Sequence, residues 1–384
     1  MSRFLFVLLP LAGHVNPAGA IGASLAAGGH QVAYAGSRAR LRPHLGEDAL
    51  IYPTGMRVYG GLADSGTASV RSLWQRFIVP FTRHTLAAVE QAVQAYQPDV
   101  LVVDQHALAG ALIAQRHGLP WASLASSSME LTEPLRGLPQ VGAWIDGHMT
   151  SLRAFAGLPA DGPDLRFSPY LVIALTSAAL TGGHQFPGHY ALVGPAIAAR
   201  PPAAGFPWHR LDPGRRKVLV TLGTMADENS AGFYPRAVQA LAPLASRVQA
   251  IVVAPPGMIT GPPEDLLVFS RVPQLELMPR LDAVICHGGM NTVCEALSFG
   301  VPLVIAPLTR DQPVNANQVV AAGAGLRVHF HRVRPQQLRA ALATVLDDPS
   351  YRAAAAAIGA SFAAAGGARA AAEYLERLAL PPPG

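Results

Sequence analysis

The sequence predicts an α/β protein with two doubly wound halves, each a parallel sheet covered by helices on both faces. Runs that are apolar throughout alternate with helical segments, which is typical of parallel strands buried on both sides. A stretch dense in proline and glycine, Ala198–Gly214, interrupts this pattern, which then begins again at Lys217. The length of 384 residues suffices for two domains of ordinary size.

The first half begins with an apolar run, Phe4–Leu9, expected to form a strand and to lead into a helix over Asn16–Ala27. A second, longer helix is expected over Leu73–Tyr96. The stretches Met56–Ser72 and Ser126–Gln140 are rich in Gly, Ser and Pro and are expected to be long loops, which usually lie over a site. The other expected elements are the strands Gln31–Ala35, Val100–Val103 and Trp121–Leu124, the helix Leu108–Arg116, and a last strand ending at Leu192–Pro195.

The second half repeats this organisation. Its expected strands are Val218–Leu222, Val248–Ala254, Leu266–Phe269, Ala283–Cys286 and Leu303–Ala306. The alanine-rich end, Tyr351–Leu378, is expected to form two helices broken at Gly366 and Gly367, with low-complexity disorder as the alternative. The expected division is a first domain at 1–197, a linker at 198–216, a second domain at 217–365, and at 366–384 a C-terminal helix able to return to the first domain.

Composition argues against several classes of protein. Hydrophobic residues make up 50% of the chain and charged residues only 14%, which favours large cores over disorder. The formal charge is +5, but the arginines are scattered and Lys217 is the only lysine, so no nucleic-acid partner is expected. Two cysteines, Cys286 and Cys294, match no metal-binding spacing and favour a reduced, cytoplasmic setting. Met1–Leu11 lacks a cleavage site and is better explained as a strand than as a signal segment.

The segment Cys286–Gln318 carries the most specific pattern in the chain. After a strand end it presents a histidine, two glycines, the polar start of a helix and a carboxylate one turn later: His287, Gly288, Gly289, Asn291, Thr292 and Glu295. The glycines allow a bulky anion to approach the backbone, and the free N–H groups and positive dipole end of the helix would face it. The carboxylate is placed to reach a sugar hydroxyl, so the segment predicts a nucleotide-sugar site.

A second constellation lies near the N-terminus. Gly13 and Pro17 flank His14 on the first strand-to-helix turn, where a neutral imidazole could take a proton from an acceptor hydroxyl. Asp104 ends another apolar strand, and a carboxylate bonded to the far ring nitrogen fixes the tautomer and stabilises the imidazolium. The alternatives are a structural histidine and an N-cap role for Asp104 in the helix that follows. The sequence favours a catalytic dyad.

Both constellations follow expected strands. In open α/β sheets ligands lie outside the carboxyl ends of the strands, and five polar residues occupy such positions: His14, Asp104, Thr224, His287 and Asp311. Gly223 and Thr224 end the first strand of the second half. The glycine permits close approach, and the Thr224 hydroxyl and amide could bind the outer phosphate, with a simple turn as the alternative.

Taken together, these motifs resemble family 1 glycosyltransferases of the GT-B fold, of the bacterial natural-product and macrolide type. The resemblance covers the whole chain and rests on the order and spacing of Val272–Leu277, of His287–Asn291 and of Asp311 with Gln312. It implies two Rossmann-like doubly wound domains that face a central cleft, the first binding the acceptor and the second the nucleotide-sugar donor.

The resemblance also implies roles for the donor residues. His287 and Thr292 would bind the diphosphate, and Glu295 would bind the ribose hydroxyls. Asp311 and Gln312 would hold hydroxyls of the donor sugar.

The base and the nucleotide are described less fully by the resemblance. Val272 and Gln274 would border the nucleobase. Many members of the family carry a stacking tryptophan where this chain has Arg271, which can also stack. Asn291 with Glu295 resembles users of uridine donors, so a UDP-hexose, with glucose favoured, is expected as co-substrate, and a dTDP-deoxysugar is the alternative.

The implied reaction is an in-line displacement that inverts the anomeric configuration, with His14 as general base and Asp104 as its partner. No paired acidic motif lies near the donor segment, so no catalytic metal and no cofactor beyond the nucleotide sugar are expected. The expected partners are a small-molecule acceptor and the nucleotide sugar, without nucleic acid or membrane. The oligomeric state, monomer or homodimer, stays open.

The acceptor is the least defined part of the expectation. Four aromatic residues on two expected helices could line an apolar pocket, or they could belong to the core: Trp74, Phe77, Phe81 and Trp144. A membrane lipid or a carotenoid is the alternative acceptor. A non-catalytic partner protein is disfavoured by the presence of both dyad residues, and a nucleotide-sugar epimerase by the acceptor-base motif.

Overall fold

The computed structural model of the chain describes residues 1–55, 66–127, 130–132, 137–198, 205–223, 231–263 and 265–380. The chain forms two compact units. The first unit comprises Met1–Ser177, His184–Ala198 and Ala364–Gly384, and the second comprises Ala178–Gly183 and Ala199–Ala363.

The sheet of the first unit is parallel in every pairing, with strand order β3-β2-β1-β4-β5-β6-β7. Its strands are β1 (Arg3–Val7), β2 (Gln31–Gly36), β3 (Ile51–Pro53), β4 (Val100–Asp104), β5 (Trp121–Ala125), β6 (Leu171–Ala174) and β7 (Tyr190–Leu192). The order runs one way from β1 to β3 and the other way from β4 onward. A crevice that binds ligands forms at such a reversal, outside the carboxyl ends of the two central strands.

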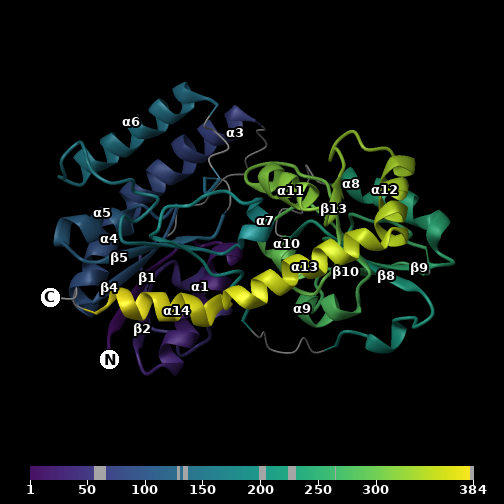
Figure 1. Cartoon of the computed structure of the whole chain (residues 1–384), viewed down its shortest axis with the longest axis horizontal. Helices are drawn as coiled ribbons and strands as arrows, with labels where there is room; N and C mark the ends of the chain where they lie inside the picture. Colours follow the sequence, from purple (N-terminus) through teal and green to yellow (C-terminus); the bar gives the residue numbers. More distant parts are fainter. Residues whose placement is uncertain are drawn as a thin grey trace. The chain divides into compact units, whose positions relative to one another are not determined.

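Helices cover both faces of this sheet. They are α1 (Ala12–Ala27), α2 (Arg38–Leu45), α3 (Thr67–Ser72), the π-helix η1 (Leu73–Ile78), α4 (Val79–Tyr96), α5 (Ala109–His117), α6 (Pro139–Phe155) and α14 (Gly367–Leu378). In β1, Leu5 and Val7 enter the core under α4, α5 and α6, whereas Phe4 and Phe6 enter the core under α1 and α14 (Figure 1). Because neighbouring residues of a strand point to opposite faces, two buried faces require a run that is apolar throughout.

The second unit has the same topology in six strands, with order β10-β9-β8-β11-β12-β13 and parallel pairing. Its strands are β8 (Arg216–Thr221), β9 (Val248–Val253), β10 (Leu267–Phe269), β11 (Ala283–Cys286), β12 (Leu303–Ile305) and β13 (Gly325–Arg327). The strand order reverses between β8 and β11, so the second unit has its own switch point.

The helices of the second unit again flank the sheet, with separate buried clusters on its two faces. They are α7 (Ala178–Thr181), η2 (Trp208–Arg210), α8 (Phe233–Leu241), η5 (Ala242–Leu244), α9 (Gln274–Leu277), η6 (Met278–Arg280), α10 (Met290–Ser298), α11 (Gln312–Ala321), α12 (Pro335–Asp347) and most of α13 (Pro349–Ala365). Both units therefore confirm the doubly wound parallel sheets expected from the sequence.

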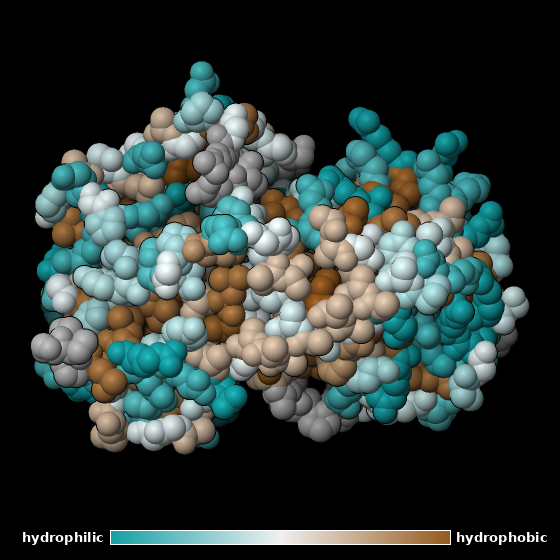
Figure 2. Space-filling model, in the orientation of Figure 1, coloured by the Kyte–Doolittle hydropathy of each residue, from teal (hydrophilic) through white to brown (hydrophobic). Residues whose placement is uncertain are grey.

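The alanine-rich end forms α13 and α14, and the chain turns at Gly366, whose φ is +87°. In the first unit, α14 packs beside α1 (Figure 1), and Ala371 and Leu375 are buried in the core that α1 covers. The N–H of Gly367 donates to the Val193 carbonyl at 2.6 Å. The outer side of α13 exposes mainly alanine, which Figure 2 shows as a light brown area.

Two expectations of local structure need correction. Thr67–Ser72 is the helix α3, whereas the sequence suggested a loop from Met56 to Ser72; residues 56–65 lie outside the described part of the chain. The first helix begins at Ala12 and not at Asn16, so His14 lies in its first turn. No helix in the described ranges combines the length and apolar character needed to cross a bilayer.

Candidate active site

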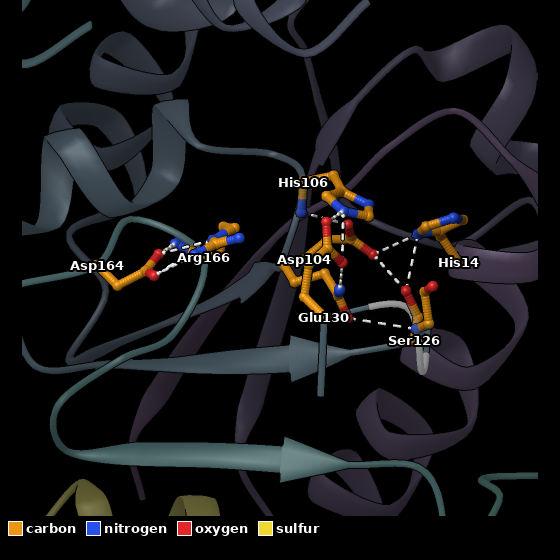
Figure 3. Close-up of polar contacts among 9 residues, drawn as sticks. His14, Asp104, His106, Ser126, Glu130, Asp164 and Arg166 are labelled. Carbon is orange, nitrogen blue, oxygen red and sulfur yellow. Dashed lines mark hydrogen bonds and ion pairs between the residues drawn. The ribbon is translucent and has the colours of Figure 1, made fainter. Parts of the chain in front are cut away.

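The first group of candidate residues lies at the strand-order reversal of the first unit. His14 follows β1, and Asp104 is the last residue of the adjacent strand β4. Nδ1 of His14 lies 2.6 Å from Oδ2 of Asp104, as Figure 3 shows. The His14 side chain has an exposed fraction of 16%, whereas the Asp104 side chain is fully buried. The ring can therefore meet a ligand while the carboxylate cannot.

The environment of Asp104 keeps its carboxyl group ionised. Burial by itself raises the pKa of Asp104, but the His14 imidazole and the nearby His106 outweigh it, so the pKa is lowered. Its Oδ1 accepts the backbone N–H of His106 at 3.0 Å. A carboxylate can only accept hydrogen bonds, so Nδ1 of His14 donates to it and Nε2 keeps a lone pair for an incoming hydroxyl proton.

The alternative role of Asp104 as a helix cap is not observed. The helix α5 begins at Ala109 with Leu108 as the N-cap residue, and no side chain caps it.

Further polar residues surround this dyad that the sequence analysis did not identify. Ser126 Oγ lies 2.8 Å from Nδ1 of His14 and 3.0 Å from Oδ2 of Asp104. Behind them, His106 Nε2 lies 3.1 Å from Oε1 of Glu130, and both side chains are buried (Figure 3). Its position in the sequence could have identified Ser126, because it directly follows β5, the strand next to β4, and so lies at the same sheet edge as Asp104.

The second group lies at the reversal of the second unit. His287 follows β11, and Gly223 lies two residues after the end of the neighbouring strand β8. Gly223 has φ +57°, and a Cβ there would lie 2.9 Å from the His287 ring. A Cβ on Gly289 would lie 2.6 Å from Nε2 of the same ring. Only glycine leaves the ring edge uncovered at these two positions.

Burial makes His287 a neutral side chain. Its exposed fraction is 6%, and burial lowers its pKa to about 4, an effect that the nearby Thr221 backbone partly offsets. Its Nδ1 has no hydrogen-bond partner among the described residues. A buried ring nitrogen without a partner beside a helix start is a group suited to a ligand.

The start of α10 provides further donors beside this ring. Met290, Asn291 and Thr292 form its first turn, where backbone N–H groups have no partner inside the helix. Gly288 has φ +89°, and a Cβ there would come within 2.8 Å of Ile305. These features suit an anion. Thr224, the other residue expected at the phosphates, lies outside the described residues.

The residues expected at the nucleoside meet in part. Gln274, at the start of α9, donates from Nε2 to Oε2 of Glu295 at 2.6 Å. Glu295 lies on α10 with an exposed fraction of 3%. Val272 is half-buried against the core of the second unit, and Arg271 is exposed. The hydrogen bond between Gln274 and Glu295 thus joins a residue expected to border the nucleobase to one expected to bind the ribose.

The residues expected at the donor sugar are held by a helix start. Asp311 is the N-cap residue of α11, and Gln312 is its first residue. The side-chain oxygen of Gln312 accepts the backbone N–H groups of Leu308 and Thr309 at 2.8 and 3.0 Å, so what it can offer a sugar is its amide N–H. Asn315 was not identified from the sequence.

Asn315 links the glycine loop to this helix start. Its Nδ2 donates to the Gly288 carbonyl at 2.9 Å and to Oδ2 of Asp311 at 3.0 Å. With an exposed fraction of 1%, Asn315 is one of the most deeply buried polar residues of the unit.

The aromatic residues expected at the acceptor belong mainly to the core. Trp74, Phe77 and Phe81 have exposed fractions of 0, 5 and 3% and pack with α4 and α6 against the first sheet. Trp144 is half-buried against the same core, and its ring centroid lies 4.4 Å from that of His148. The structure thus places three of the four in the core, which was the alternative to an acceptor pocket.

Metal binding and thiol chemistry depend on how the histidine, cysteine and carboxylate side chains of the described ranges are arranged, and the two cysteines lie in the core. Within those ranges, no group of three or more His, Cys, Asp or Glu is arranged to hold a metal ion. Cys286 and Cys294 are buried, and burial raises the pKa of each thiol to about 12, so neither is a reactive thiolate.

Comparisons of sequence place this geometry in a known context. Residues 250–378 match the family described as Erythromycin biosynthesis protein CIII-like, C-terminal domain. The uncharacterized UDP-glucosyltransferase YojK of Bacillus subtilis (strain 168) is 30% identical over 293 residues, which are 72% of each chain. The NDP-glycosyltransferase YjiC of the same organism is 28% identical over 395 residues, which are 97% of each chain.

Comparison of structures gives the fold. The glycotransferase of kitacinnamycin superposes with a TM-score of 0.81 at 24% identity, covering 99% of both chains. The spinosyn rhamnosyltransferase SpnG, solved with thymidine diphosphate, gives a TM-score of 0.80 at 22% identity, covering 97% of this chain and all of its own. These likenesses confirm the expected GT-B fold.

Proposed function

The chain belongs to the family 1 glycosyltransferases of the natural-product type and is thus a sugar-transferring enzyme; from this premise we propose that it is an inverting, metal-independent hexosyltransferase. The proposed donor is UDP-glucose, and the proposed acceptor is a hydroxyl of a small apolar or aromatic natural product. The proposal includes no cofactor besides the nucleotide sugar.

The observation that carries this proposal is the His14–Asp104 pair. Nε2 of the ring takes the proton of the acceptor hydroxyl, and the buried carboxylate stabilises the imidazolium that forms. The acceptor oxygen attacks the anomeric carbon while the bond to the diphosphate breaks on the opposite face. One displacement inverts the configuration and leaves the nucleoside diphosphate as the other product.

The diphosphate site proposed in the second unit stabilises the leaving charge. The first-turn N–H groups of α10 and the ring N–H of His287 would donate to the phosphate oxygens. Because burial keeps His287 neutral at physiological pH, it contributes a hydrogen bond and not a positive charge. The helix dipole and neutral donors would then carry the stabilisation without a metal ion.

The nucleotide is proposed from Glu295. Its buried carboxylate can accept hydrogen bonds from two adjacent ribose hydroxyls, and a deoxyribose offers one fewer. This favours a uridine over a thymidine nucleotide, in agreement with the name of the relative YojK. A dTDP-deoxysugar is the second candidate, and the thymidine diphosphate bound to the structurally similar SpnG supports it.

A thermal-shift screen of UDP, dTDP and their sugars tests the donor. We expect UDP and UDP-glucose to raise the melting temperature more than their thymidine counterparts at equal concentration. Mass spectrometry of products from a polyphenol and macrolide panel then identifies the acceptor class. Stabilisation by dTDP alone would favour the second candidate, and the absence of any glycoside from every donor would contradict sugar transfer to this acceptor class.

A further inference from the structure

Ser126 shares the polar contact of the dyad. Its Oγ lies 2.8 Å from His14 Nδ1 and 3.0 Å from Asp104 Oδ2, and its exposed fraction is 7%. Figure 3 shows the three side chains converging from three different segments: His14 from α1, Asp104 from the end of β4, and Ser126 from just after β5. The hydroxyl therefore covers the Nδ1–Oδ2 hydrogen bond from one side.

The ionised state of Asp104 decides which atom accepts the hydrogen bond from the Ser126 hydroxyl. The lowered pKa of Asp104 makes it a carboxylate, so Nδ1 of His14 carries the shared proton. A protonated Nδ1 cannot accept a hydrogen bond from the Ser126 hydroxyl. The Ser126 O–H consequently donates to Oδ2 of Asp104, the same oxygen that receives Nδ1–H. In a Ser-His-Asp triad the serine faces the opposite ring nitrogen from the carboxylate. Here both lie at Nδ1, so Ser126 is not activated as a nucleophile.

A second set of contacts fastens the residues after β5 to those after β4. Gln105 Nε2 donates to Glu130 Oε2 at 2.8 Å, and Gln105 Oε1 accepts the backbone N–H of Ser127 at 3.3 Å. His106 Nε2 lies 3.1 and 3.2 Å from the two oxygens of Glu130. Gln105, His106 and Glu130 all have exposed fractions of 8% or less.

The charges of this set are balanced. Burial opposes ionisation of both His106 and Glu130, but their mutual attraction outweighs it, so the pKa of His106 is raised and that of Glu130 is lowered. The pair is therefore ionised together. The Arg166 guanidinium, paired with Asp164, lies on the far side of Glu130 (Figure 3). Removing one partner of such a buried pair leaves an uncompensated charge.

We propose that Ser126 is a positioning residue of the His14–Asp104 dyad, and that the contacts of Glu130 with Gln105 and His106 hold Ser126 in place. The inference rests on the proposed function because it assigns Ser126 a role only if His14 is the base. The hydroxyl orients the carboxylate, and it shields the Nδ1–H bond from water. Nε2 then faces the acceptor in one orientation.

Proton exchange tests the shielding without any substrate. In ¹⁵N-histidine-labelled protein, the His14 ring signals are those missing from His14→Ala. We expect the Nδ1–H proton of His14 to exchange with water at least about tenfold faster in Ser126→Ala than in the wild type. Ser126→Thr, which keeps the hydroxyl, should exchange as slowly as the wild type. Equal rates in Ser126→Ala and the wild type would overturn the proposal.

Kinetics test the catalytic consequence with UDP-glucose and the best acceptor of the panel. Ser126→Ala should lower kcat on the order of tenfold with both KM values unchanged, and Ser126→Thr should restore kcat. Glu130→Gln should lower kcat in the same way. If Glu130→Gln has the kinetics of the wild type, Glu130 does not hold Ser126 in place.

A double-mutant cycle separates positioning from general damage. Ser126→Ala should have no further effect in a His14→Ala background, whereas a serine that only supports the fold would lower the residual rate again. If His14→Ala itself keeps full activity, the proposed function fails whatever Ser126 does. If His14→Ala stops transfer and Ser126→Ala behaves as the wild type, only the present inference fails.

Discussion

Gln274 and Glu295 are joined by a hydrogen bond of 2.6 Å between Nε2 and Oε2, although they are 21 positions apart in the sequence. The contact connects the start of α9 to the inner side of α10. It fixes one carboxylate oxygen of a residue that is 3% exposed. In the proposed donor site, this bond holds the ribose-binding group before the nucleotide arrives, which reduces the entropy lost on binding.

Replacing Glu295 by Ala should weaken donor binding. Hydrogen bonds to a charged group contribute about 1.5–3 kcal/mol, so the apparent dissociation constant for UDP-glucose should rise on the order of 10- to 100-fold. Isothermal titration with UDP-glucose measures it. Glu373→Ala, which removes an exposed carboxylate in the first unit, is the control. An unchanged constant in Glu295→Ala would remove this residue from the ribose site.

Replacing His14 by Ala should separate chemistry from donor binding. Loss of a general base lowers turnover by a factor on the order of 10² or more. The dissociation constant for UDP should stay at the wild-type value because the proposed diphosphate groups belong to the second unit. His117→Ala, which removes another histidine paired with a carboxylate, is the matched control. Nearly intact transfer in His14→Ala would make the base assignment wrong.

Asn315 offers a test of how the donor site is held together. Asn315→Ala removes the bonds to Gly288 and Asp311, so UDP binding should weaken and UDP-glucose binding should weaken further. The comparison uses dissociation constants for both ligands. Asn317→Ala changes an exposed asparagine of the same helix and should leave both constants unaltered. Equal losses for the two ligands would restrict Asn315 to the diphosphate side.

His287 should make the protein sensitive to acid. The folded state keeps the ring neutral down to about pH 4, whereas the unfolded chain binds a proton near the ordinary pKa of 6.5. Between these values the unfolded state binds more protons, so the free energy of unfolding falls as pH decreases, by about 3 kcal/mol at pH 4. Above pH 6.5 both states are neutral and the effect vanishes.

Urea unfolding at pH 4.5 and 7.5 measures this effect. Asp104 and Glu130 have lowered pKa values and also lose stabilisation in acid, so the wild type is compared with His287→Gln. The variant should lose less stability than the wild type between the two pH values. An equal loss would show that His287 is protonated in the folded protein.

Chelation tests the metal-free mechanism. Because the proposed charge stabilisation uses the α10 start and neutral donors, EDTA should leave the transfer rate unchanged. The rate is measured with and without EDTA, and again after Mg²⁺ is restored. A loss that Mg²⁺ reverses would contradict this part of the account.

The sequence predicted the residues whose position follows from strand ends. Apolar runs identified β1, β4, β8 and β11, and in each parallel sheet the central pair must place its carboxyl ends together, which brings His14 to Asp104 and His287 to Gly223. The strand β6, Leu171–Ala174, is equally apolar but was not among the expected strands.

The contacts made by loops and helix interiors were not predictable in the same way. Ser126 contacts the dyad and Glu130 contacts His106, and no periodicity of the sequence predicts either contact. Asn315 looks like an ordinary helical residue until the chain folds against Gly288. Conversely, Trp74, Phe77 and Phe81 share the spacing of a helix face, which both a core and a ligand pocket allow, and in the structure they are buried against the sheet.

The configuration of the product tests the central claim most directly. The wild-type enzyme is supplied with UDP-α-glucose and the best acceptor of the panel, and the anomeric proton of the purified glycoside is examined by NMR. A single displacement with His14 as base predicts the β-glycoside. An α-glycoside would show that transfer retains configuration and would contradict the account.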